Sequence, residues 1–173
     1  MNYASGWHVM YVKSRWEKRV DESLKESSLE SFVPLTRTLR QWSDRKKMIM
    51  KPLLPSYVFV NLNSPTEFHK ALAVDGACSF IRFGRQYARV TDREINNIKF
   101  LVEDQNIMDI ETDTGLPCVG DFKRLTYGPL QGLECEVIKV NNVSKVVVRI
   151  DSLQQNIIAT VPAAYIADLA NMA

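Results

Sequence analysis

Residues 39–62 run LRQWSDRKKMIMKPLLPSYVFVNL, a basic segment followed by two prolines and an apolar run. The apolar part, YVFVNL, is rich in β-branched and aromatic residues and predicts a buried strand over 57–62. The basic part predicts the tip of a long hairpin at QWSDRKK, residues 41–47. A cationic loop therefore leads directly into a strand of the core, and the rest of the sequence must explain why.

The positive charge of the chain is concentrated in its N-terminal third. The 173 residues have a net charge of only +2, but residues 1–60 hold 11 Lys and Arg against 6 Asp and Glu. Six cations lie within fifteen residues that contain a single acid, and they are Arg37, Arg40, Arg45, Lys46, Lys47 and Lys51. Such a cluster indicates a local anionic partner, although charge alone favours a solvated loop.

Length and composition predict a globular protein of the cytoplasm. The chain can form one ordinary domain or two small ones, and 46% hydrophobic residues suffice for a core. It has no run of eighteen apolar residues and no signal-peptide pattern, so we expect no membrane contact. Three widely spaced cysteines without a CxxC pair predict neither a disulfide framework nor a zinc ribbon, as in a reducing compartment.

Working outward from the hairpin, the elements alternate in the order strand, helix, strand, strand, helix, strand, helix. We expect strands over 6–14, 30–39, 57–62 and 78–84, and helices over 14–26, 64–76 and 91–104. This order is that of the ferredoxin-like, split βαβ arrangement. The predicted class is α+β, with an antiparallel sheet that carries helices on one face.

All three helices have capping signals in the sequence. The pairs with the spacing of capping boxes are Ser14 with Glu17, Ser64 with Glu67, and Thr91 with Glu94. Gly76 is placed to end the second helix. The three helices are therefore predicted with definite starts.

The C-terminal third predicts a second, smaller domain. We place the end of the first domain after residue 102, so that it spans 1–102. Residues 103–118 contain five acids and no bases and predict a linker. Residues 119–173 combine short β-rich runs with Gly, Pro and Asn turns and predict a small β-barrel, ending in a short helix over 163–173.

The sequence offers no catalytic constellation. His8 and His69 have no Cys, Asp or Glu at metal-ligand spacing, and no phosphate-binding or nucleophile motif occurs. Cys78 is predicted to be a buried strand residue, because no base accompanies it. We expect no catalytic residue, no cofactor and no bound metal, and therefore no enzyme.

Aromatic residues on the predicted strands leave two arrangements open. Tyr57 and Phe59 share one strand face, and Trp7 and Tyr11 share one face of the first strand. They form a partner-binding patch on the open face of the sheet, or they form the core under the helices. Strand face cannot be assigned without a register.

Several of these stretches resemble one family in order along the chain. WHVMYVKSRWEKRV (7–20), FVPL (32–35), RQWSDRKK (40–47), PLLPSYVFV (52–60) and FIRFG (80–84) resemble the N-terminal (NGN) domain of the NusG family of transcription elongation factors. GDFKRLTYGPLQGLECEVIKV (120–140) resembles the KOW motif of that family's SH3-like barrel, with Gly128 and Gly132 in motif positions. Cys135 stands where this motif commonly has glycine.

The hairpin narrows the resemblance to specialised paralogues. RQWSDRKK and RFGRQYARVTDREI (82–95) resemble RfaH, LoaP and above all the UpxY-type antiterminators of capsular polysaccharide operons. The resemblance implies an operon-specific factor that binds RNA polymerase and suppresses pausing and termination. Two alternatives remain, an RNA- or ribosome-binding KOW module and a general NusG that acts at all genes.

The resemblance also implies the contact residues. An apolar patch would dock on the clamp helices of the largest polymerase subunit, and it comprises Tyr11, Leu54, Pro55, Tyr57, Phe59 and Phe83. The opposing polymerase subunit would meet Phe68, His69, Lys70 and Ala71. Non-template DNA would meet Lys13, Arg15 and Arg19, and upstream DNA would meet the hairpin residues Arg37, Arg40, Arg45, Lys46 and Lys47.

Further partners follow from the same resemblance. Nascent RNA is an additional candidate ligand, and the KOW domain would recruit a ribosomal protein or a termination factor. A competing inhibitor protein is known for the UpxY group. The factor itself is expected to be a monomer, and Trp42 is expected to brace the hairpin rather than stack on a base.

Overall fold

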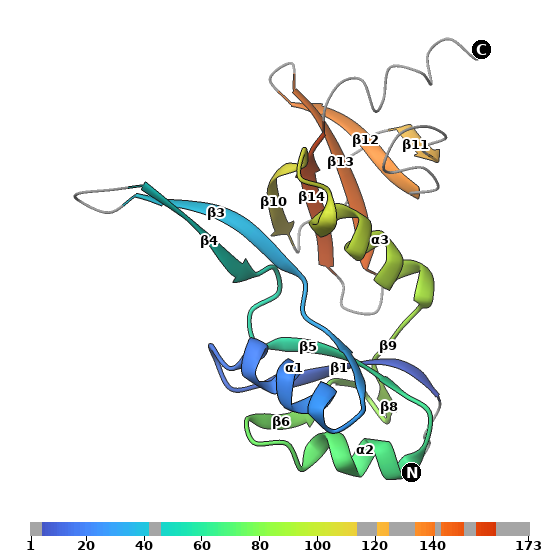
Figure 1. The fold of residues 1–173 in the computed structure, drawn as a ribbon. Coiled ribbons are helices and arrows are strands. Elements are labelled where there is room, and N and C mark those ends of the chain that lie inside the picture. Colours follow the sequence, from blue (N-terminus) through green and yellow to red (C-terminus); the bar gives the residue numbers. More distant parts are fainter. Residues whose placement is uncertain are drawn as a thin grey trace. The chain divides into compact units, whose positions relative to one another are not determined.

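A computed structural model describes residues 5–41, 46–113, 121–124, 134–140, 143–150 and 155–161. The chain divides into two compact units, residues 1–34 with 52–92 and residues 35–51 with 93–173. Figure 1 shows their elements. None of the helices in the described ranges has the length and apolar character needed to span a bilayer.

The first unit is built on one antiparallel sheet. Its elements are β1 (Gly6–Val12), α1 (Glu17–Glu26), β2 (Glu30–Phe32), β5 (Tyr57–Leu62), α2 (Pro65–Leu72), β6 (Ala77–Phe80), β7 (Arg82–Phe83), β8 (Gln86–Tyr87) and β9 (Arg89–Val90). The sheet order is β2-β5-β1-β6, and β9 also pairs with β1. Each helical crossover skips one strand, β5 between β1 and β2, and β1 between β5 and β6. This is the predicted split βαβ arrangement.

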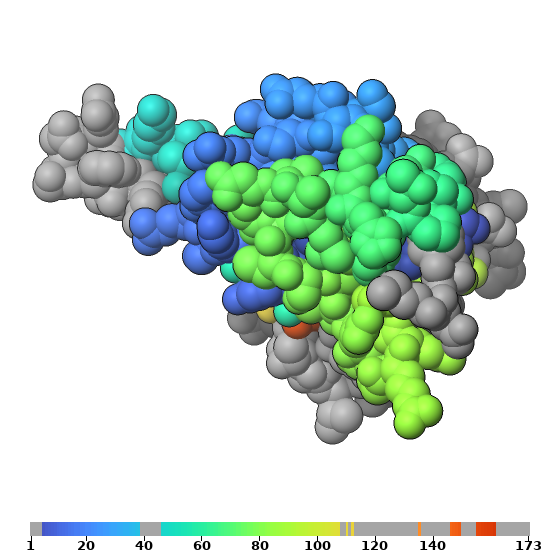
Figure 2. Space-filling model, turned by 90° about the horizontal axis from the view of Figure 1, so that it is seen from below, coloured from blue at the N-terminus to red at the C-terminus, as the bar shows by residue number. Residues whose placement is uncertain are grey.

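Helix α2 covers one face of this sheet. Met10 lies opposite Val58 on β5 and opposite Phe80 on β6, so these three side chains share a face. The ring of Phe68 on α2 stacks on Phe80 with centroids 4.5 Å apart. Seen from below, α1 in blue and α2 in green both form part of the surface of this unit (Figure 2).

Helix α1 does not begin at the predicted cap. It starts at Glu17 with Trp16 at the N-cap position and no side-chain cap bond. Arg15 has φ of 67°, a left-handed backbone that cannot belong to a right-handed helix. The capping box of Ser14 and Glu17 was therefore a wrong prediction, although Val20 on this helix is buried in the core.

Helix α2 begins as predicted. Ser64 Oγ accepts a hydrogen bond from the Glu67 N–H at 3.2 Å, and the Glu67 carboxylate accepts one from the Asn63 N–H at 2.6 Å. Gly76 does not end the helix, which stops at Leu72. It lies instead in the turn before β6 with φ of +93°.

Two predicted strands are each divided in two. The strand expected over 30–39 splits at Pro34 into β2 and β3 (Leu35–Gln41), because proline supplies no N–H to a ladder. The strand expected over 78–84 splits into β6 and β7. Since β6 lies at the sheet edge, Cys78 is exposed rather than buried, and that prediction was wrong.

The second unit holds a two-stranded ribbon, a helix and a second sheet. Its elements are β3, β4 (Lys46–Pro52, which ends in the first unit), α3 (Asp92–Glu103), β10 (Met108–Asp113), β11 (Asp121–Arg124), β12 (Glu134–Val140), β13 (Val143–Ile150) and β14 (Gln155–Thr160). Strands β3 and β4 pair with each other, and the sheet order is β10-β14-β13-β12-β11. Among the described strands this path is open, so closure into a barrel stays a prediction.

Part of the predicted linker is a strand. Residues 108–113 form β10, which pairs antiparallel with β14. Their sequence, MDIETD, alternates apolar or β-branched residues with acids. This period of two predicts a strand, but the linker was predicted from the number of acids instead. The domain boundaries after residue 102 and before residue 119 stay a prediction. The expected helix over 163–173 lies outside the described residues.

Candidate functional site

The turn before β5 is fixed by backbone hydrogen bonds and one carboxylate. The Leu53 N–H donates to the Pro34 carbonyl at 2.8 Å, and the Val12 N–H donates to the Ser56 carbonyl at 2.9 Å. Ser56 has φ of 65°, which serine seldom adopts. Its N–H donates to Oε1 of Glu17 at 2.7 Å. The turn residues are therefore held in one conformation from both β1 and α1.

Two tyrosines next to this turn form an exposed pair. Tyr11 lies directly opposite Tyr57 in the β1–β5 register, with ring centroids 6.1 Å apart in an edge-on arrangement. Tyr11 is 44% exposed, Tyr57 is half-buried and Pro55 is exposed. Because strand side chains alternate, this pair lies on the sheet face opposite the Met10 face that α2 covers.

Other members of the predicted apolar patch lie in the core. Phe59 is fully buried and Leu54 is nearly so, and the ring of Phe59 stacks on that of Phe32 with centroids 6.1 Å apart. Neither of the two arrangements left open by the sequence holds for the whole set, because Phe59 shares a strand face with Tyr57 and is nevertheless buried. Phe59 is a core residue, whereas Tyr11 and Tyr57 present an aromatic surface.

The cations at the start of α1 surround one indole. Lys13 Nζ lies 4.9 Å and Arg19 Cζ lies 4.4 Å from the Trp16 ring centroid. Both cations also pair with the Asp75 carboxylate, at 3.7 Å and 3.9 Å. Arg15, with its left-handed backbone, is exposed beside them. The structure thus brings together Lys13 and Arg19, two of the three cations predicted to meet DNA, and Arg15 lies between them in the sequence.

The net positive charge of this cluster allows it to bind an anion. Exposed ion pairs at such distances contribute only about 0–1 kcal/mol, so Asp75 is easily displaced. Cation–π contacts orient Lys13 and Arg19 without neutralising them. The cluster of three cations and one acid keeps a local charge of +2.

The ribbon of β3 and β4 exposes part of the predicted basic hairpin. Arg37, Lys46 and Lys47 are exposed. Arg40 belongs to β3, and nothing further is described of its side chain. Arg45 and Trp42 lie outside the described residues, as do Gly128 and Gly132, the glycines of the predicted KOW motif.

The predicted α2 contact segment is half core and half surface. Phe68 and Ala71 are buried, because they face the sheet one helical turn apart. His69 and Lys70 are exposed. A partner at this helix would therefore meet His69 and Lys70, whose charged or polar groups project outward.

A buried histidine lies on β1, an inner strand of the same sheet. His8 is almost fully buried, and its Nδ1 lies 2.8 Å from the Gly6 carbonyl. Since a carbonyl only accepts, Nδ1 carries the proton in this bond. Desolvation by burial lowers the pKa of His8. The rings of Phe80 and Tyr87 pack edge-on against His8, which is the environment of a structural core residue.

Three residues of this surface were missed by the sequence reasoning. Glu17 was assigned to a helix cap, and Trp16 and Asp75 were assigned no role at this surface. Glu17 and Ser56 are 39 residues apart, so no local spacing signals their contact. Asp75 comes directly before Gly76 in the turn that precedes β6. An acid at a glycine turn is the only sequence signal that could have suggested a contact with the cations at the start of α1.

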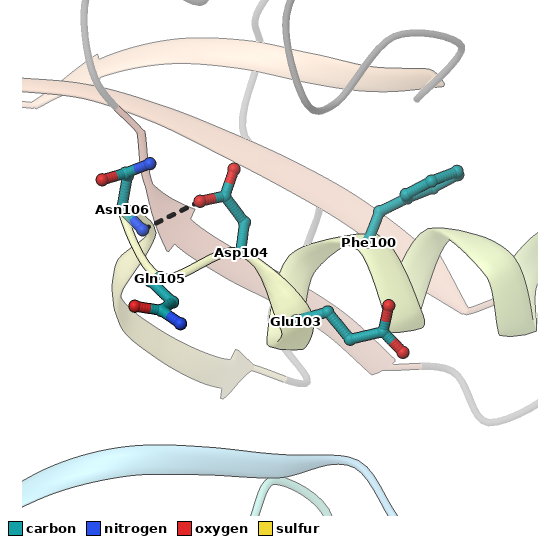
Figure 3. Close-up of a pocket in the computed structure, with 5 residues that line it drawn as sticks. All are labelled: Phe100, Glu103, Asp104, Gln105 and Asn106. Carbon is teal, nitrogen blue, oxygen red and sulfur yellow. Dashed lines mark hydrogen bonds between the residues drawn. The ribbon is translucent and has the colours of Figure 1, made fainter.

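A hollow at the end of α3 offers no further chemistry. It is lined by Phe100, Glu103, Asp104, Gln105 and Asn106, and the Asn106 N–H donates to Asp104 Oδ1 at 2.8 Å (Figure 3). Within the described ranges, no three His, Cys, Asp or Glu side chains are grouped to hold a metal ion.

Known proteins place this fold in a family. The family model described as "Transcription termination factor nusG" matches residues 5–99. A structure of Thermotoga maritima NusG, described as showing domain interaction, is 21% identical, with a TM-score of 0.49 over 90% of this chain and 93% of that chain. An MjSpt4:Spt5 complex is 13% identical, with a TM-score of 0.34 over 84% and 86%. Curated protein sequences give no match.

The match to the family model spans every element of the first unit, including the Tyr11–Tyr57 pair, the turn before β5 and the cations of α1. It covers more than half of the 173 residues. This chain therefore belongs to the NusG family of transcription factors.

Proposed function

We propose that this protein docks on the clamp helices of the largest RNA polymerase subunit through Tyr11, Pro55 and Tyr57. The observation that carries the proposal is the exposed Tyr11–Tyr57 pair, with rings 6.1 Å apart. Aromatic side chains held rigidly at a surface are typical anchors of protein interfaces. The Glu17–Ser56 hydrogen bond keeps the anchor turn preformed, which reduces the entropy lost on binding.

Nucleic acid held by the polymerase would meet the cationic surfaces. Lys13, Arg15 and Arg19 would approach the non-template strand, and the exposed Arg37, Lys46 and Lys47 would face upstream DNA. Phosphate contacts by such residues give salt-dependent affinity. The basic hairpin and the docking strand would then bind two parts of the same transcription complex. This would explain why they are adjacent in the sequence.

The resulting activity would be operon-specific antitermination of the UpxY type, in the cytoplasm, at polysaccharide biosynthesis operons. The factor would favour the closed, elongating clamp only by binding it more tightly than the open form. A preference of about 1.4 kcal/mol would shift the pausing equilibrium about tenfold. The second unit, as a KOW domain, would recruit a ribosomal protein or a termination factor.

Capture of core RNA polymerase by the purified protein tests the docking surface. The double variant Tyr11→Ala and Tyr57→Ala should lose capture while its circular dichroism spectrum is unchanged. Phe59 is unsuitable for this purpose, because emptying a buried aromatic site costs about 3–5 kcal/mol of stability. Phe100→Ala is the matched control, since Phe100 is 40% exposed but lies on α3.

Either of two results would reject the proposal. One is capture by the folded double variant at wild-type level. The other is failure of the wild type to capture polymerase at low and moderate salt, after which RNA and ribosome binding become the hypotheses to pursue.

A further inference from the structure

A second cationic surface lies on the small ribbon formed by β7 and β8. Arg82 pairs with Tyr87 and Phe83 with Gln86, and Gly84 and Arg85 join the two strands. Gly84 has φ of +61°, and glycine at the first position of a two-residue connection is typical of a type II′ hairpin turn. Apart from Gly84 and its two chain neighbours, no described residue has an atom within 4 Å of the position that a Gly84 Cβ would take. The tip therefore projects from the described part of the first unit.

The two faces of this ribbon have different surroundings. Tyr87 faces the core, because its ring lies 4.9 Å from Phe68. Phe83 and Gln86, one position along each strand, point to the opposite face. Phe83 is 54% exposed, and Gln86 is exposed beside it. The outer face thus presents a free ring surface next to an amide.

The charged residues that flank this ring in the sequence are all positive. Between Gly76 and Thr91 the sequence contains Arg82, Arg85 and Arg89 and no acid. This cluster lies in the part of the chain whose net charge is negative, so the overall balance conceals it. A single exposed phenylalanine is ordinary on a protein surface, but this one is followed two residues later by the exposed Arg85 in a stretch of sequence without acids.

Two of the three arginines are fixed in place. The guanidinium of Arg82 lies over the Tyr87 ring, 4.3 Å from its centroid, and donates to the Tyr87 hydroxyl. Arg89 donates to the Ser5 carbonyl at 2.5 Å. Each keeps further N–H donors. Arg85, at the tip, is exposed next to Phe83 and has a complete fork for a phosphate.

We propose that the β7–β8 ribbon binds single-stranded nucleic acid, with a base stacked on Phe83 and a phosphate held by Arg85. A ring surface can accept a base only where the base is unstacked, which favours a single strand over a duplex. Arg82 and Arg89 add positive potential along the strand path. This contact goes beyond the proposed docking and gives Phe83 a different partner from the polymerase surface that the family resemblance implies.

Fluorescence anisotropy with the full-length protein tests the contact without polymerase. The probes are a labelled oligo(dT), a labelled oligo(U) and a labelled duplex of the same length. Phe83→Ala should weaken binding of the preferred single strand about 5-fold to 100-fold, the range expected for loss of one stacked base. Phe83→Leu, which keeps bulk but removes the aromatic ring, should behave like Phe83→Ala. Duplex binding should be unchanged, because the cations of α1 and of the β3–β4 ribbon remain.

The arginine and the control complete the design. Arg85→Ala should reduce the slope of log affinity against log salt by about 0.7 for a single strand, and Phe100→Ala should change nothing. Binding of oligo(dT) above oligo(U), or the reverse, tells DNA from RNA as the natural source. Polymerase capture by the Phe83→Ala variant is measured separately and reports on docking alone.

Three outcomes would overturn the proposal. The first is unchanged single-strand affinity in both Phe83→Ala and Arg85→Ala. The second is an equal loss of single-strand and duplex affinity in Phe83→Ala, which would rule out stacking. The third is binding of polyglutamate as tight as that of oligo(dT), weakened in Arg85→Ala but unchanged in Phe83→Ala, which would assign the ribbon to an acidic protein surface.

Discussion

The Glu17 carboxylate, at the first position of α1, accepts a 2.7 Å hydrogen bond from the Ser56 N–H in the turn before β5. Glu17 is 4% exposed, and Ser56 has the left-handed backbone of φ 65°. This one contact joins the helix that carries the basic cluster to the turn that presents Pro55 and Tyr57. It makes the geometry of both surfaces depend on a residue that neither surface exposes.

Removing this acceptor should destabilise the first unit. Glu17→Ala leaves the Ser56 N–H without its partner, and an unsatisfied buried donor costs about 1–3 kcal/mol. Glu17→Gln keeps an acceptor oxygen and should cost less. Urea unfolding measures both. Glu22→Ala, at an exposed position on the same helix, should stay within about 0.5 kcal/mol of the wild type, and a Glu22 effect as large as that of Glu17 would contradict the assigned role.

Gly76 and Gly84 form a matched pair for testing close packing. Both have positive φ, but a Cβ on Gly76 would lie 2.7 Å from Trp16 Cε3 and 2.9 Å from Val20 Cγ2, whereas one on Gly84 meets nothing. Gly84→Ala should cost about 1–2 kcal/mol for the left-handed backbone alone. Gly76→Ala should cost about 1–3 kcal/mol more, from overpacking. Equal losses in urea unfolding would show that Trp16 moves aside freely.

Local signals predicted the structure well where the interacting residues are close in sequence. The Ser64–Glu67 box formed because its members are three residues apart. The box expected of Ser14 and Glu17 did not form, since the left-handed Arg15 delays the helix and Ser56 supplies a better donor for Glu17. A pattern rule cannot anticipate a competitor 39 residues away.

The candidate site needed the strand register as well as the pattern. Tyr11, Tyr57 and Phe59 all fit an aromatic patch by residue type, and only the pairing of Tyr11 with Tyr57 at one end of the sheet distinguishes exposed from buried members. Strand β10 shows the converse case. Its period of two was present in residues 108–113, but the five acids of residues 103–118 outweighed it in the interpretation.

Stability should depend on pH through His8. Burial lowers its pKa below the ordinary 6.5, opposed by the hydrogen bond to Gly6 and reinforced by Arg89. The unfolded chain takes up a proton near pH 6.5, while the folded chain does so only at lower pH. The free energy of unfolding should therefore fall as pH drops from about 6.5 toward the lowered pKa, by at most about 1.4 kcal/mol per pH unit.

Urea unfolding between about pH 7.5 and pH 5.5 measures this slope, above the range in which most carboxylates titrate. His8→Gln should flatten it. His69→Gln changes the exposed histidine of α2 and should leave the slope intact. A slope that persists in His8→Gln, or disappears in His69→Gln, would assign the pH dependence to another group.

Asp75 should restrain nucleic-acid binding at the start of α1. Its carboxylate pairs with Lys13 and Arg19 at 3.7 Å and 3.9 Å, so an incoming phosphate competes with it for both cations. Asp75→Asn should raise affinity for duplex DNA about twofold to fivefold, the scale of an exposed ion pair, with the gain shrinking between about 50 mM and 200 mM salt.

Glu26→Gln separates this local competition from a general change in charge. It alters the net charge equally, but Glu26 lies at the far end of α1, roughly 13 Å along the helix from Glu17. That distance exceeds the screening length of about 8 Å at physiological salt, so its effect on affinity should be small. If Glu26→Gln and Asp75→Asn raised affinity equally at moderate salt, the gain would come from overall charge. Asp75 would then not compete specifically with phosphate for Lys13 and Arg19.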